Sequence, residues 1–404
     1  MTNESVITST SINNSDYSLQ LNRWFLKPIG VWPLSSTTPR LERIASVTLN
    51  ILCYGFVLFA IVPSLLQMIL SDENLYTKIK MLGPVSHWMV SCVNYTALLT
   101  RSKEIRHCVE HIQADWQMVT RESDQQLMLR NARFGRYVAA WCMIFMQGSV
   151  LFFCFVAAFA TEIIQVGNET RIIHVLPCAV YKKLVNVDES PMNEIFLFVQ
   201  ISSAFIATFS TVGIFSFSAV LAAHACGQLN VVMLWITEYV NDSRDKKAGT
   251  LNKIGVIVEQ HLRTLKFISF IEEVLNRIYF LELFRCTMDI CILSYYILAE
   301  WVDHDIKNLA TYFFILISIL FNIFILCYMG EILSEKSKKV GEAVYMTNWY
   351  HLPERSILDL ILIITRSSVV VHITAGKFIR MSIYTFGDVV RTGFAYLNLL
   401  RRIS

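Results

Sequence analysis

The sequence predicts an all-α membrane protein with seven transmembrane helices, a cytosolic N-terminus and an extracellular C-terminus. The chain of 404 residues is 54% hydrophobic and only 17% charged, whereas an ordinary soluble domain is about 25% charged. Its apolar residues form long uncharged runs instead of the spaced pattern of amphipathic helices. Lys and Arg gather in alternate loops between these runs. The three observations together favour a protein that crosses the membrane several times.

Seven runs are expected to be spans, because about 20 helical residues suffice to cross a bilayer. In chain order they are Ala45–Leu70, Met81–Thr100, Tyr137–Thr161, Ile195–Thr237, Cys286–Ala299, Asn308–Gly330 and 376–404. The fourth run would reach about 65 Å as one helix. A single helix that leaves the membrane is the simplest interpretation, and a hidden pair of spans is the alternative. Asp289 interrupts the fifth run, and Arg285 lies one turn earlier, so an i,i+4 ion pair could satisfy both charges.

The segments between the spans divide the chain into four regions. Residues 1–44 are expected to be a polar, partly disordered cytosolic arm, and residues 45–330 a bundle of six spans. Charged, helix-compatible extensions of this bundle into the cytosol are expected at 101–136 and 223–285. Residues 331–375 are interpreted as a cytosolic anchor region, and 376–404 as the seventh span.

The orientation follows from the distribution of positive charge, since cytosolic loops carry the excess of Lys and Arg. The N-terminal arm and the second, fourth and sixth loops, the sixth counted from 331 to 380, hold 26 of these residues, whereas the first, third and fifth loops hold 6. This asymmetry predicts a cytosolic N-terminus. The sequon at Asn168 would then be extracellular and open to glycosylation, although other sequons fall in predicted cytosolic or membrane segments.

Several classes of function are disfavoured by what the sequence lacks. Motifs typical of enzymes, namely G-x-S-x-G, H-E-x-x-H and the phosphate-binding loop, are absent. Cys and His residues have no metal-ligand spacing, so neither a metal nor another cofactor is expected. A G-protein-coupled receptor is disfavoured by the reversed orientation and by the missing Asp-Arg-Tyr and Asn-Pro-x-x-Tyr motifs. No internal repeat indicates a transporter. A channel, gated by a ligand or not, is the class that remains.

The C-terminal part of the chain resembles the signature of insect odorant receptors. The matching residues are Asn348-Trp349-Tyr350, Pro353, Arg355, Thr365-Arg366-Ser367, Thr374-Ala375-Gly376-Lys377-Phe378, Met381-Ser382, Phe386 and Tyr396. The chain length, the seven spans and the long cytosolic helix at 258–275 are also similar to this family. Two features depart from it, because Ala395 precedes Tyr396 where Ser is common and no proline follows Ser367. The C-terminal sequence is less similar to that of the related gustatory receptors, which are the second interpretation.

The resemblance implies a subunit of an odorant-gated, non-selective cation channel in the plasma membrane of olfactory sensory neuron dendrites. It implies a hetero-tetramer with an obligate co-receptor, in which the last helix of each subunit lines the pore. It also implies that a volatile ligand binds in the outer half of the bundle. Divergence from the co-receptor's C-terminus indicates a ligand-tuned subunit. No nucleic acid partner is expected, and the basic residues 336–339 are expected to lie near lipid headgroups.

Candidate odorant-binding residues are aromatic, aliphatic or weakly polar side chains in the outer halves of the spans, because small apolar ligands need such a lining. They are His87, Trp88, Ser149, Phe152, Phe153, Val199, Ser202, Ile206, Tyr296 and Tyr312. For each residue, ordinary packing within the bundle is the competing interpretation.

The seventh span carries a stripe of small, polar and apolar residues that recur with helical spacing. The stripe consists of Thr385, Val389, Thr392, Tyr396, Leu399 and Ile403. It either packs against neighbouring helices or faces the axis of a tetramer, and the resemblance favours the second alternative. Leu399 and Ile403 would then form an apolar gate near the outer end. A ring of Arg402 would repel cations, so we expect poor conduction from a homomer of this chain.

Overall fold

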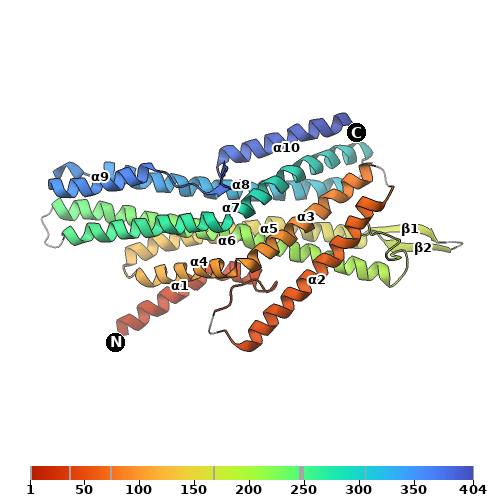
Figure 1. Ribbon diagram of the computed structural model, residues 1–404, viewed down its shortest axis with the longest axis horizontal. Coiled ribbons are helices and arrows are strands. Elements are labelled where there is room, and N and C mark those ends of the chain that lie inside the picture. The colour runs from red at the N-terminus through yellow and green to blue at the C-terminus, as the bar shows by residue number, and fades with distance from the viewer. Residues whose placement is uncertain are drawn as a thin grey trace.

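The structure is a computed structural model that describes residues 2–35, 38–72, 75–166, 169–244, 250–304 and 306–403. It is mainly helical, as predicted, and the helices labelled α6, α7 and α8 run roughly along the longest axis of the molecule, whereas α2 and α3 cross it obliquely (Figure 1). The α-helices are α1 (Thr2–Leu26), α2 (Arg40–Leu70), α3 (Leu75–Thr100), α4 (Ser102–Met118), α5 (Glu122–Phe159), α6 (Met192–Arg244), α7 (Thr250–Asp303), α8 (Ile306–Tyr345), α9 (Glu354–Ser368) and α10 (Ile383–Ile403).

Helix α6 is the centre of the bundle and packs against α5, α7 and α8. It is one continuous helix of 53 residues, about 80 Å long, which agrees with the single-helix interpretation of the fourth run. Of the 18 residues in its most apolar stretch, 83% are buried. Its hydroxyl side chains are satisfied within the helix, as where Thr208 donates to the Ala204 carbonyl and Ser218 to that of Ile214.

Four helices of the described chain are long and apolar enough to cross a membrane, namely α2, α5, α6 and α8. The other three expected spans correspond to α3, the second half of α7, and α10. Charged residues lie within these helices, such as Arg285 in α7 and Arg391 in α10, and they lower the hydropathy of each. The charged extensions continue the spans without a break, because α5 and α7 each join an extension to a span.

The N-terminal arm differs from the expectation of partial disorder. Helix α1 spans Thr2–Leu26, and the side chains of Leu19 and Leu26 are fully buried. Leu26 lies so close to Gly213 of α6 that a β-carbon there would be 2.4 Å from its Cδ2. Because the composition of the arm is polar, the sequence did not indicate this apolar face of α1, which packs against α6.

Two short hairpins interrupt the helical architecture. Strands β1 (Thr161–Val166) and β2 (Glu169–His174) pair antiparallel beyond the end of α5 (Figure 1). The predicted glycosylation residue Asn168 lies between them, outside the described residues. Strands β3 (Thr374–Ala375) and β4 (Ile379–Arg380) pair directly before α10. The last helix therefore begins at Ile383 and not at residue 376, because Gly376 and Lys377 adopt positive φ angles of 62° and 66° and turn the chain.

Candidate functional site

A cavity of about 190 Å³ lies between α3, α5, α7 and α8, with contributions from α6 and from the segment before it. Most of its wall is apolar or aromatic. Its lining residues are Gly83, Pro84, His87, Trp88, Met146, Ser149, Val150, Phe153, Pro177, Ala204, Arg285, Asp289, Ile292, Leu293, Tyr296, Tyr312, Ile315, Ser318 and Ile319. A mostly apolar wall with a few polar groups is the usual character of a small-molecule site.

Six of the ten predicted ligand-binding residues meet at this cavity. They are His87, Trp88, Ser149, Phe153, Tyr296 and Tyr312. Tyr296 and Tyr312 are in ring contact, with centroids 5.4 Å apart, and join α7 to α8 across the cavity. The structure thus brings together residues that are more than 200 positions apart in the sequence.

The other four predicted residues do not line the cavity. Phe152 packs against Phe314 of α8, with ring centroids 5.2 Å apart, because neighbouring residues of a helix point about 100° apart and Phe153 takes the inward direction. On α6, the predicted set Val199, Ser202 and Ile206 is replaced by Ala204. The sequence could not distinguish these faces, since the whole run is apolar.

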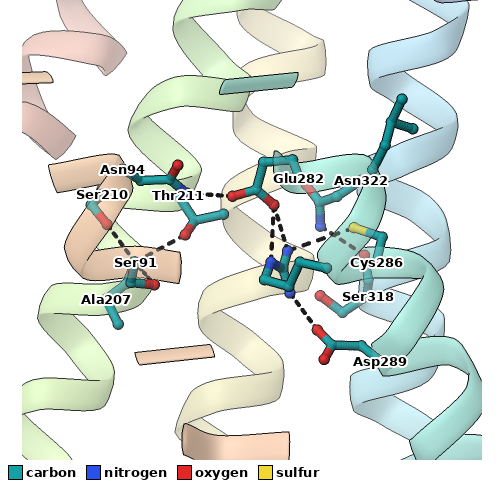
Figure 2. Close-up of polar contacts among 12 residues, drawn as sticks. Ser91, Asn94, Ala207, Ser210, Thr211, Glu282, Cys286, Asp289, Ser318 and Asn322 are labelled. Carbon is teal, nitrogen blue, oxygen red and sulfur yellow. Dashed lines mark hydrogen bonds and ion pairs between the residues drawn. The ribbon is translucent and has the colours of Figure 1, made fainter. Parts of the chain in front are cut away.

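A charged network borders the cavity, and we call its members Asn94, Glu282, Arg285 and Asp289 the cavity cluster. The Arg285 guanidinium donates to Glu282 Oε2 through Nε at 3.0 Å and Nη2 at 2.7 Å, and to Asp289 Oδ2 through Nη1 at 2.5 Å. Asn94 of α3 donates to the other oxygen of Glu282. All four side chains are buried. Figure 2 shows Glu282 and Asp289 along α7, with Asn94 reaching Glu282 from α3.

Arg285 and Asp289 therefore form the i,i+4 pair that the sequence predicted. The contact between Asn94 and Glu282 was not predicted, because the two residues are 188 positions apart in the chain. Two carboxylates around one guanidinium, with an amide on the free carboxylate oxygen, satisfy most of the hydrogen-bonding capacity of a buried charge.

The face of α7 next to the cavity cluster contacts α10. A β-carbon at Gly393 of α10 would lie 2.7 Å from Cγ2 of Ile290 and 3.4 Å from the Thr287 carbonyl oxygen. The absence of a side chain at Gly393 thus permits close approach of the two helices. Asp289 at the cavity wall and Ile290 at the contact with α10 are consecutive residues, so the cavity and the last helix meet the same turn of α7.

The buried face of α10 consists of Thr385, Val389, Gly393 and Leu397, which recur every four residues. Thr385 and Val389 are each 8% exposed, and α10 packs against α7 and α8. Tyr396, by contrast, is 43% exposed. Within this chain, Thr385 and Val389 of the predicted stripe are therefore covered by other helices, whereas Tyr396 is exposed.

The remaining members of the predicted stripe differ in how far the structure describes them. Thr392 is half-buried at the edge of the covered face. Leu399, Arg402 and Ile403 belong to the last turns of α10, and the positions of their side chains lie outside the described residues.

The C-terminal sequence signature clamps the hairpin before α10 onto α7. The Gly376 amide donates to the Asn276 carbonyl at 2.8 Å, and the Thr374 hydroxyl donates to Glu272 at 2.5 Å. A β-carbon at Gly376 would lie 3.0 Å from the Phe280 ring. On the same stretch of α7, Arg101 donates to the carbonyls of Glu273 and Val274. The signature residues therefore hold α10 at a fixed place on α7.

A second buried charged network joins α4, α6 and α7, and we call its members His111, Asp115, His224 and Arg263 the Asp115 cluster. Asp115 is 2% exposed. Its Oδ2 lies 2.9 Å from His224 Nε2 and 3.3 Å from His111 Nε2, and its Oδ1 forms an ion pair with Arg263 at 2.7 Å. His111 stacks on Phe267 at 4.1 Å.

Burial and neighbouring charges shift the pKa values of His111 and Asp115 in the Asp115 cluster. Burial lowers the pKa of His111 to about 4, against the attraction of Asp115 and with the help of Arg263 and neighbouring histidines. Burial alone would raise the pKa of Asp115, but the hydrogen bond from His224 and the surrounding positive charges bring it below its usual value. Asp115 is thus held as a carboxylate. The sequence does not indicate the bond between His224 and Asp115, because the two residues are 109 positions apart.

The fold and the cavity define a class of protein: a helical membrane protein that encloses a small, mostly apolar site within its bundle. A sequence profile of the 7tm odorant receptor family matches residues 74–394. The chain belongs to this family, which confirms the resemblance found in its C-terminal sequence.

Individual relatives agree with this assignment. Odorant receptor 67c of Drosophila melanogaster is 23% identical over 45% of this chain and 44% of its own length. Odorant receptor 10 of Aedes albopictus is 24% identical over 56% of this chain and 60% of its own length. The chain therefore spans about half the length of these curated relatives. The family is one of receptors and not of enzymes.

The fold extends the similarity over the full chain. The insect olfactory receptor OR5 from Machilis hrabei, solved in complex with eugenol, superposes with a TM-score of 0.80 and 15% identity, covering 98% of this chain and 100% of that receptor. A second structure of the same receptor gives a TM-score of 0.76 at 14% identity. At this identity the likeness establishes the fold alone.

Proposed function

We propose that the chain is a ligand-tuned odorant receptor subunit that forms an odorant-gated, non-selective cation channel with co-receptor subunits. The observation that carries this proposal is the cavity. It lies between four long helices, is lined mainly by apolar and aromatic side chains, and meets the same turn of α7 that contacts the last helix. Family membership and the full-length likeness to a receptor solved with eugenol support the same function.

The volatile ligand occupies the cavity in this proposal. Trp88, Phe153, Tyr296 and Tyr312 supply the aromatic surface that would bury most of a small odorant. The cavity slightly exceeds the size of about 150 Å³ at which an apolar cavity in a protein accepts benzene. A ring with a short substituent, or a chain of similar volume, fits this size.

The membrane topology in this proposal has seven spans, namely α2, α3, α5, the first part of α6, the last part of α7, α8 and α10. The distribution of Lys and Arg places the N-terminus in the cytosol and the C-terminus outside. Helix α10 has 21 residues, about 32 Å in length, which matches a bilayer core of about 30 Å. The protein then resides in the plasma membrane of the sensory neuron's dendrite.

Helix α10 lines the ion pathway in the assembled hetero-tetramer. Its charged residues Asp388 and Arg391 support this role, because a helix surrounded by lipid would lose about 2.5–3.5 kcal/mol for each charge near its centre. Thr392 and Tyr396 lie beside the exposed face, and Leu399 and Ile403 continue the stripe as an apolar gate. Four copies of Arg402 would repel cations, so co-receptor subunits without this charge are required for good conduction.

Electrical recording tests the proposal. Cells that express the chain together with an odorant co-receptor are expected to give odorant-evoked cation currents that persist when G-protein signalling is blocked. Cells that express this chain alone are expected to give little current. Currents that vanish with the G-protein block would contradict the channel, and robust currents from the chain alone would contradict the need for a partner.

An epitope tag tests the topology independently. Placed after the C-terminus, it is expected to be stained on the surface of unpermeabilised cells, and a tag at the N-terminus only after permeabilisation. The reverse pattern would contradict the proposed orientation.

A further inference from the structure

The cavity is apolar over most of its wall but not at one side, where His87 of α3 and Arg285 and Asp289 of α7 meet it. The Nε2 atom of His87 is buried and has no hydrogen-bond partner among the described residues. A buried polar atom without a partner destabilises a protein unless something else satisfies it. Because His87 lines the cavity, a polar ligand there can become the partner of this atom once the ring turns toward it.

The second polar group at this side of the cavity is the Asp289 carboxylate. Its Oδ2 accepts a hydrogen bond from Arg285 at 2.5 Å. A carboxylate offers about four acceptor positions, so the group retains capacity toward the cavity that it lines. His87 can either donate or accept through Nε2, depending on its tautomer. At this side of the cavity, Asp289 therefore offers a hydrogen-bond acceptor, and His87 offers either a donor or an acceptor.

Charge limits which ligands fit there. A carboxylate ligand would meet the Asp289 carboxylate at the wall, and the nearby Arg285 guanidinium is already shared by Asp289 and Glu282. An ammonium ligand would lie beside Arg285, which lines the same cavity and carries a full positive charge. Most of the donors of Arg285 are already used by Glu282, Asp289 and the sulfur of Cys286. A neutral group that both donates and accepts meets neither obstacle.

We infer that the cavity selects compact, neutral odorants that carry a hydroxyl group on an apolar body, with the hydroxyl donating to Asp289 and contacting His87. This inference rests on the proposed function of the cavity as the odorant site. The aromatic and aliphatic wall then holds the rest of the molecule. Replacement of the hydroxyl by a methyl group would leave His87 unsatisfied and Asp289 covered by apolar surface.

The experiment compares probes of one shape and different polarity. The probes are 2-phenylethanol, propylbenzene, 2-phenylethylamine and phenylacetic acid, and the aliphatic pair 1-octanol and nonane. Each is applied to cells that express the chain with a co-receptor, and half-maximal concentrations are measured from currents. Binding to the purified full-length chain is measured in parallel by tryptophan fluorescence, since Trp88 lines the cavity.

The alcohols are expected to act at concentrations about 10- to 100-fold lower than the matched hydrocarbons, as for a hydrogen bond to a charged group. His87→Phe keeps an aromatic ring and is expected to remove most of this preference, as is Asp289→Asn. His87→Gln, which still donates and accepts, is expected to restore part of it. Gln147→Leu is the matched control, because Gln147 is also buried without a partner among the described residues but does not line the cavity.

The two readouts separate the inference from the proposed function. A fluorescence preference for alcohols without any odorant-evoked current would support the inference and contradict the channel. Currents evoked equally by alcohols and hydrocarbons would support the channel and overturn the inference. A preference for the amine or the acid, an unchanged preference in both His87→Phe and Asp289→Asn, or no binding of any probe would also overturn it.

Discussion

The two buried charged networks of this protein use the same chemistry in different surroundings. In the cavity cluster, Arg285 is held by two carboxylates and borders an open volume. In the Asp115 cluster, one carboxylate is held by Arg263 and two histidines, with Phe267 stacked against His111. The comparison teaches that a buried charge by itself does not mark a binding site. Contact with a cavity makes the cavity cluster a candidate binding site, whereas the contacts of the Asp115 cluster join α4, α6 and α7.

The largest expected effect breaks the Asp115 cluster. Asp115→Ala leaves Arg263 without its buried partner, and loss of one partner of a buried pair costs about 3–5 kcal/mol. We expect a strongly reduced melting temperature of the detergent-solubilised protein and little protein at the cell surface. Glu238→Ala is the control, because its ion pair with Arg121 is exposed and such pairs contribute about 0–1 kcal/mol. Equal stability of the two variants would contradict a fastening role for Asp115.

A second substitution tests whether the cavity cluster acts on the last helix. Gly393→Val would push α10 away from Ile290, and overpacking of this kind costs about 1–3 kcal/mol. Because α7 also carries Asp289, we expect altered current amplitude and half-maximal odorant concentration, measured at equal surface abundance. Gly387→Ala is the control, since nothing lies within 4 Å of a β-carbon placed there. Identical odorant responses from both variants would argue against coupling through α7.

The third expectation concerns pH and sharpens the difference between the clusters. The pKa of His111 is lowered to about 4 in the folded protein, against about 6.5 in an unfolded chain. Between these values the unfolded state binds the extra proton, so stability rises with pH in this window. A shift from pH 7 to pH 5 is expected to cost about 2 kcal/mol, seen in the melting temperature. His111→Phe should lose this pH dependence, and a variant that keeps it would contradict the assignment to His111.

The sequence predicted those features that depend on residues close to one another in the chain. The apolar runs predicted the long helices, and the four-residue spacing of Arg285 and Asp289 predicted their ion pair. The packed N-terminal helix was missed, because its apolar residues Leu19 and Leu26 are dispersed among polar ones.

Hydrogen bonds between residues far apart in the sequence could not be predicted from it. The links from Asn94 to Glu282 and from Asp115 to His224 depend on how the helices pack. The sequence also left open which face of α10 packs against other helices, and the close approach of Gly393 to α7 depends on how the two helices pack. Six of the ten predicted residues line the cavity, because aromatic and weakly polar side chains within an apolar bundle tend to line such a site.

The measurement that tests the central claim most directly is an odorant dose–response series on three variants at equal surface abundance. Trp88→Ala and Tyr312→Ala remove cavity wall, whereas Phe152→Ala removes an aromatic ring that packs against Phe314 outside the cavity. The account predicts that the first two raise the half-maximal odorant concentration about tenfold or more, equivalent to about 1.4 kcal/mol, and that Phe152→Ala changes it little. Unchanged responses in the two cavity variants, or a larger shift in Phe152→Ala, would contradict the cavity as the odorant site.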